Sequence, residues 1–108
     1  MTLERATVWI DGVPVTILPR RAPVGNSGPI RGRTLAIFPA PADSAPSLSA
    51  VLPAHASDRF TATLEPGTRP AVAVADLAEA AALTAGRALG LDEILYWDGR
   101  RAQVLACR

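Results

Sequence analysis

The sequence predicts an α+β fold: a single two-layer domain in which one long helix packs on one face of a mostly antiparallel sheet of four to six strands. Three observations lead to this prediction. Two Asp-Gly pairs each lie between apolar runs, which is the pattern of a β-hairpin. Two further apolar or alternating runs predict strands, and an alanine-rich stretch predicts the helix. The length of 108 residues suits one domain, 1–108.

The first hairpin is expected over residues 5–18. The segments R-A-T-V-W-I and V-P-V-T-I-L flank Asp11-Gly12. Pro14 has no N–H to donate to a neighbouring strand, so its strand is expected at an edge of the sheet or at a non-bonded position.

The middle of the chain alternates strands with proline-rich connections. The strand at 33–38 is expected to be central because R-T-L-A-I-F is so apolar, and the strand at 59–65 places Phe60, Ala62 and Leu64 on one face. The connections are an arginine-rich loop at 19–32 and a second loop at 39–57, in which a short helix from about Pro46 to Leu52 is expected.

The last third is expected to form the long helix at about 76–89 and a hairpin at 93–107. Asp76 can cap the helix, Glu79 has the spacing of a capping box, and Gly90 ends it. The segment A-V-A-V-A at 71–75 is either a short strand or the lead into this helix.

Charge is unevenly distributed although the net charge is only +1, which gives no bulk electrostatic argument for nucleic acid. All eleven basic residues are arginines, which bind carboxylate and phosphate bidentately. The candidate binding residues are the loop arginines Arg20, Arg21, Arg31 and Arg33, the acidic Glu79, Asp92 and Glu93, and the hairpin residues Trp97, Arg100 and Arg101.

Aromatic side chains are few, so each one matters. Tyr96 and Trp97 are adjacent in a predicted strand and must point to opposite faces. One is expected in the core and the other exposed beside Arg100 and Arg101, a composition typical of interface hot spots. Trp9 presents the same choice between core and surface.

Catalytic and metal-binding signatures are missing from the sequence. His55 is the only histidine, and its neighbours Ser57 and Asp58 share one predicted loop rather than converging from rigid elements. With Cys107 the only cysteine, a closed zinc site fails by ligand count. We therefore predict no cofactor, no metal and no catalytic residue.

The alanine-rich helix followed by Y-W-D-G-R-R-A-Q-V-L-A-C resembles the C-terminal part of an uncharacterised family of small bacterial α/β proteins. This resemblance implies a fold and no activity. In overall type, a small chain with long loops, a mixed-charge surface and no cofactor motif is similar to phage-encoded inhibitors, including anti-CRISPR proteins. Such inhibitors cover a surface of a host defence complex.

These observations predict a non-enzymatic protein-binding module, most specifically a phage-type inhibitor of a bacterial defence complex such as a CRISPR effector. Either the arginine loop or the acidic residues would provide electrostatic complementarity. The alternatives are a small enzyme or accessory subunit using His55 with Asp58 or Asp43, and a nucleic-acid binder through the arginine loop. We expect a soluble cytoplasmic protein without a membrane segment, and an unprotected strand edge could pair two copies.

Overall fold

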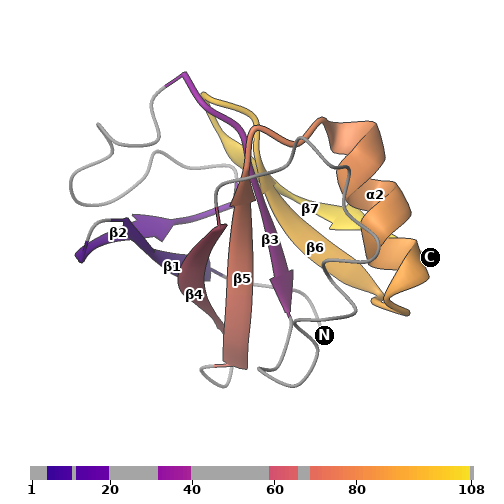
Figure 1. Cartoon of the computed structure of the whole chain (residues 1–108), viewed down its shortest axis with the longest axis horizontal. Coiled ribbons are helices and arrows are strands. Elements are labelled where there is room, and N and C mark those ends of the chain that lie inside the picture. The colour runs from indigo at the N-terminus through magenta and orange to yellow at the C-terminus, as the bar shows by residue number, and fades with distance from the viewer. Residues whose placement is uncertain (1–4, 11, 20–31, 40–58, 66–68, 108) are drawn as a thin grey trace.

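The structure is a computed structural model that describes residues 5–10, 12–19, 32–39, 59–65 and 69–107. Within these residues, seven strands form one antiparallel sheet in the order β2-β1-β4-β5-β3-β6-β7 (Figure 1). The strands are β1 (Arg5–Ile10), β2 (Val13–Ile17), β3 (Leu35–Pro39), β4 (Arg59–Glu65), β5 (Arg69–Ala75), β6 (Glu93–Trp97) and β7 (Ala102–Ala106), and the described helix is α2 (Glu79–Ala88).

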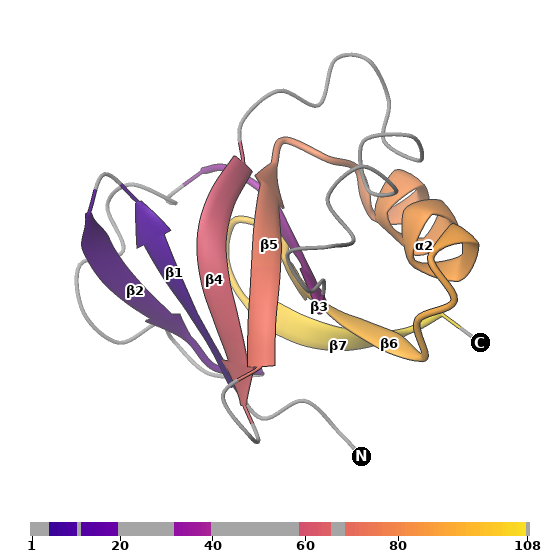
Figure 2. The ribbon, with the colours of Figure 1, turned by 60° about the horizontal axis from the view of Figure 1, so that its bottom comes forward.

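The sheet curls into a half-barrel, as Figure 2 shows. Its two edge strands, β2 and β7, meet at one end, where Pro19 forms an isolated parallel bridge with Ala102. The edges separate away from this bridge. Among the described residues, the sheet is therefore closed at one corner, and no further pairing joins its two edges.

The inside of the curl is a core to which every strand contributes. Its aliphatic residues include Val8, Ile17 and Ile37, and Trp97 joins them. Six of its members are alanines, whose small side chains allow facing parts of a tightly curved sheet to approach one another. These alanines are Ala6, Ala62, Ala71, Ala73, Ala75 and Ala102.

Helix α2 covers part of the outer side, over β3 and β6 (Figure 1). Ala82, Ala85 and Gly86 are its buried residues, and they pack against Phe38, Ile94 and Cys107. A Cβ atom added at Gly86 would lie 2.5 Å from Cys107 Sγ, so only glycine allows this approach without a shift.

The predicted fold class is wrong in the number of strands and in the length of the helix. Residues 69–75 form a seven-residue interior strand, β5, rather than a lead into the helix. Its alanine-rich sequence has modest strand propensity, but pairing with β4 on one side and β3 on the other overrides that preference. The helix spans ten residues instead of the expected fourteen at 76–89.

The predicted helix start is also wrong. Ala78 is the N-cap residue, no side chain caps it, and Asp76 lies before the helix with a left-handed φ of 61°. The predicted end is confirmed: Gly90 has a φ of 74°, and the N–H groups of Gly90 and Leu91 donate to the carbonyls of Arg87 and Gly86. This is the Schellman arrangement.

Both predicted hairpins form, and the strand at 59–65 matches β4. In the first hairpin Ile10 pairs with Val13, which leaves a loop of two residues, and Pro14 lies in edge strand β2 as expected. The strand expected at 33–38 is β3, interior but shifted to Leu35–Pro39. The helix expected from Pro46 to Leu52 falls outside the described residues.

Candidate arginine-rich interface

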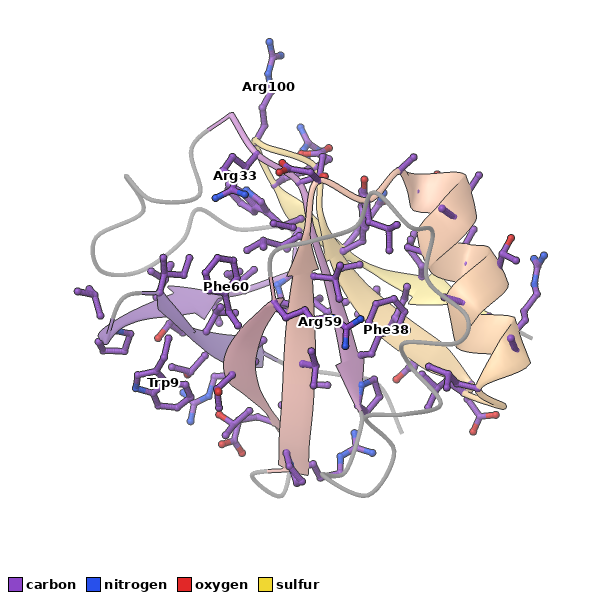
Figure 3. All side chains as sticks on the ribbon, in the orientation of Figure 1. Trp9, Arg33, Phe38, Arg59, Phe60 and Arg100 are labelled. Carbon is purple, nitrogen blue, oxygen red and sulfur yellow. The ribbon has the colours of Figure 1, made fainter. Side chains whose placement is uncertain are left out.

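Three of the predicted binding arginines lie at one end of the sheet. We call Arg33, Arg100 and Arg101 the arginine end. The connection between β6 and β7 lies against the chain just before β3, since a Cβ at Gly99 would lie 3.7 Å from the Arg33 carbonyl oxygen. Figure 3 shows Arg33 and Arg100 at this same end, and Arg100 extends away from the ribbon.

Residues 20–31, which include Arg20, Arg21 and Arg31, lie outside the described part of the chain. Their described neighbours, Pro19 and Gly32, both lie at the arginine end. Pro19 bridges Ala102, and the Cα atom of Gly32 would lie 3.9 Å from a Cβ at Gly99. The described residues on either side of the arginine-rich segment, Pro19 and Gly32, therefore both lie at the end that carries Arg100 and Arg101.

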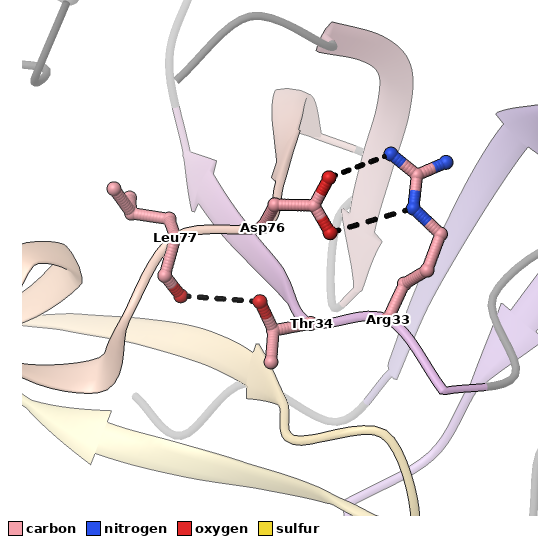
Figure 4. A network of polar contacts seen from close by, with 4 residues as sticks. All are labelled: Arg33, Thr34, Asp76 and Leu77. Atoms are coloured by element: carbon pink, nitrogen blue, oxygen red, sulfur yellow. Dashed lines mark hydrogen bonds and ion pairs between the residues drawn. The ribbon is translucent and has the colours of Figure 1, made fainter. Parts of the chain in front are cut away.

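Arg33 forms a bidentate contact with Asp76 (Figure 4). Its Nη2 atom lies 2.9 Å from Asp76 Oδ2, and Nε lies 3.5 Å from Oδ1. The hydrogen bond from Arg33 holds the pKa of Asp76 below its usual range, although the carboxylate is largely exposed. Since such exposed pairs contribute little to stability, the contact mainly orients the guanidinium group.

The start of β3 is tied to the segment before the helix by a second set of hydrogen bonds. The N–H of Asp76 donates to the Thr34 carbonyl at 2.9 Å. The carbonyl of Leu77 accepts from Thr34 Oγ1 at 3.3 Å and from the buried Tyr96 hydroxyl at 2.8 Å (Figure 4 draws the first). Burial raises the pKa of Tyr96. This junction fixes β3, β6 and the entry to α2 relative to one another.

Asp98 organises the connection that carries Arg100 and Arg101. Its Oδ1 atom accepts hydrogen bonds from the backbone N–H groups of Arg100 at 2.8 Å and Arg101 at 2.9 Å. The bonds from Arg101 and Arg100 lower the pKa of Asp98. Both arginine side chains are exposed, and their backbone is held in a defined turn.

The predicted acidic residues do not gather in one place. Glu79 is at the start of α2 and accepts a hydrogen bond from Gln103 Nε2 at 3.1 Å. Asp92 and Glu93 follow the other end of the helix, which is about 15 Å long. Asp92 is exposed and Glu93 is half-buried at the start of β6. The acidic candidates thus occupy two separate sites.

Tyr96 and Trp97 point to opposite faces as predicted, but the expectation that one is exposed is wrong. Trp97 is 3% exposed inside the curl and Tyr96 is 4% exposed under the helix. Both sides of β6 are covered, so Trp97 contributes no surface for a partner. Trp9, at 38%, is the exposed ring, opposite Pro14 on the outer side. The alternation of Trp9 with Val8 and Ile10, which are buried on the opposite face of β1, is the sequence pattern that indicates an outward-facing ring.

His55 lies outside the described residues, so its predicted roles stay predictions. Among the residues that the structure describes, no group of three or more His, Cys, Asp or Glu side chains could hold a metal ion. The same residues contain no helix of the length and hydrophobicity needed to cross a membrane.

Comparison with protein-family models, with curated proteins and with solved structures finds no match.

Proposed function

We propose that this chain is a non-enzymatic protein-binding module whose arginine end contacts an acidic surface of a bacterial protein complex. An inhibitor of a defence complex, of the phage-encoded type, would act in this way by covering a surface that the complex needs. The observation that supports this proposal is that Arg33, Arg100 and Arg101 lie at one end of the sheet. The described residues Pro19 and Gly32, which flank the segment 20–31, lie at the same end.

The chemistry of this end supports a protein partner. Arginine forms bidentate hydrogen bonds with carboxylates, and it is enriched among interface residues that dominate affinity. The Asp98 turn fixes the backbone under Arg100 and Arg101, which lowers the entropy lost on binding. Between the two charged surfaces that the sequence predicts, this arrangement favours the arginines, because the acidic candidates are dispersed.

The experiment is affinity capture of a tagged protein from bacterial lysate, with and without nuclease, followed by affinity measurement on the purified partner. We expect one partner that survives nuclease, and an affinity about tenfold or more weaker for the double variant Arg100→Ala, Arg101→Ala. The control is Arg69→Ala, which removes an exposed charge at the opposite end of β5. The end of β5 nearest the arginines is Ala75, which pairs with Leu35 and lies about 20 Å from Arg69.

Equal loss of affinity in the control and the double variant would show that only net charge matters, and unchanged affinity in both would remove the arginine end from the interface. A second function, nucleic-acid binding, is favoured by the same arginines because guanidinium groups also bind phosphate. Recovery that disappears with nuclease, with affinity falling steeply as salt rises, would establish that alternative instead.

A further inference from the structure

The two open edges of the half-barrel differ in their capacity to pair with another strand. In a hairpin with a two-residue loop, the pair flanking the loop exchanges hydrogen bonds, here Ile10 and Val13. The next pair, Trp9 and Pro14, then directs its backbone groups away from each other. At Pro14 the outer edge of β2 therefore has no N–H to donate, which is a common protection against pairing with a strand of another molecule.

Edge strand β7 has no such protection. The hydrogen bonds from Asp98 N to Arg101 O and from Cys107 N to Asp92 O fix which pairs are bonded to β6. Because bonded and non-bonded pairs alternate, the remaining residues direct their N–H and C=O groups outward. These residues are Ala102, which bridges Pro19, and Val104 and Ala106. The strand A-Q-V-L-A contains neither proline nor a charged residue.

We propose that β7 is a homodimerisation edge, which pairs antiparallel with β7 of a second copy about a twofold axis through Leu105. This register sets Val104 of one copy opposite Ala106 of the other. It uses both outward-facing residues that the bridge to Pro19 leaves available. The two sheets then continue into one another across the dimer.

The distribution of charge along the hairpin supports a second copy of this chain as the partner that pairs with β7. Exposed Arg100 and Arg101 precede β7, with Asp98 beside them. At the other end, Glu93 pairs with Ala106, and the backbone carbonyl of Asp92 accepts the N–H of Cys107. Arg87 also lies there, with Nε donating to the Cys107 carbonyl. An antiparallel pair brings the Arg100 and Arg101 end of each copy toward Asp92 and Glu93 of the other.

The expected dimer is weak. Pairing over one five-residue strand buries far less than the roughly 800 Å² per partner of a standard stable interface. Dimerisation is therefore expected to depend on concentration within the micromolar to about 1 mM range and to weaken with added salt.

The test is sedimentation of the purified chain alone over that concentration range, which separates this inference from the proposed binding of a different protein. Ala106→Pro removes an outward N–H at an exposed position and is expected to give a monomer throughout. Thr16→Pro is the matched control, because the backbone of Thr16 faces the outer edge of β2. It is expected to leave dimerisation unchanged provided circular dichroism shows it folded.

A second pair of variants does not depend on tolerance of proline. Arg101→Glu is expected to weaken the dimer about tenfold or more, whereas Arg69→Glu, the same reversal at an exposed site far from β7, leaves it unchanged. A wild-type protein that stays monomeric at about 1 mM overturns the proposal. So does a folded Ala106→Pro variant that dimerises like the wild type, or an Arg101→Glu variant that matches Arg69→Glu.

Discussion

The two hairpins of this protein begin from similar sequences, W-I-D-G-V and Y-W-D-G-R, and reach different structures. The first pairs Ile10 with Val13 and leaves Trp9 on the surface. In the second, the strands end at the pair of Trp97 and Ala102, and one backbone hydrogen bond from Asp98 N to Arg101 O continues the pairing into the connection. This hairpin buries both Tyr96 and Trp97. The difference shows that an Asp-Gly pair predicts a reversal of the chain, while the surroundings decide the loop and the exposure of its aromatic residues.

The largest expected difference between the hairpins is in their tryptophans. Trp97→Ala removes a ring that is 3% exposed in the inner core and is expected to cost about 3–5 kcal/mol of unfolding free energy. Trp9→Ala, on the outer side, is expected to cost about 1 kcal/mol or less. Urea denaturation of the two variants measures both values. Equal costs would show that Trp9 is as much a core residue as Trp97.

A smaller effect is expected from the polar anchor of the second hairpin. Tyr96→Phe removes the hydroxyl that donates to the Leu77 carbonyl at 2.8 Å, at an expected cost of about 1 kcal/mol. Thr34→Val, which removes the longer bond to the same carbonyl, is expected to cost less. Denaturation curves compare the two. A larger loss for the threonine variant would reverse the order inferred from the distances.

The smallest effect concerns the connection of the second hairpin. Hydrogen bonds from Arg101 and Arg100 lower the pKa of Asp98 in the folded protein. A lowered folded pKa means that this carboxylate stabilises the fold above its unfolded pKa of about 4, and that the contribution is lost as pH falls through the folded value. Because Asp98 is exposed, the effect is small.

Unfolding free energy measured from pH 6 to pH 2 should therefore fall less steeply for Asp98→Asn than for the wild type. Asp76, whose pKa is also lowered, contributes to the wild-type slope in the same direction. Identical slopes for the wild type and Asp98→Asn would show that the bonds to Arg100 and Arg101 do not distinguish the folded from the unfolded state.

Local signals in the sequence predicted the hairpins, β4 and the glycine that ends the helix. Each depends on residues a few positions apart: alternation in R-F-T-A-T-L-E, an Asp-Gly pair, and Gly90 in a left-handed conformation. The start of the helix was not predictable in this way. Asp76 has the spacing of a cap, but its carboxylate binds Arg33, a residue 43 positions earlier.

The same limit applies to the candidate site and to the strand count. Arg33, Arg100 and Arg101 were each identifiable as candidate binding residues, yet only the fold places them at one end of the sheet. Strand β5 was ambiguous because A-V-A-V-A has weak intrinsic preference, and two neighbouring strands decide it. One of Tyr96 and Trp97 was expected at the surface because nothing local indicated that both faces of β6 are covered.

The contact between Gly86 and Cys107 makes the thiol a natural reporter of local opening. Cys107 is 2% exposed beneath the helix, and burial raises its pKa, so a thiol reagent encounters little reactive thiolate in the closed protein. Labelling then requires Cys107 and α2 to separate. When closing is faster than reaction, the labelling rate gives the free energy of that opening. The cysteine would thus measure how often the contact between α2 and the end of the C-terminal hairpin opens in molecules that are otherwise folded.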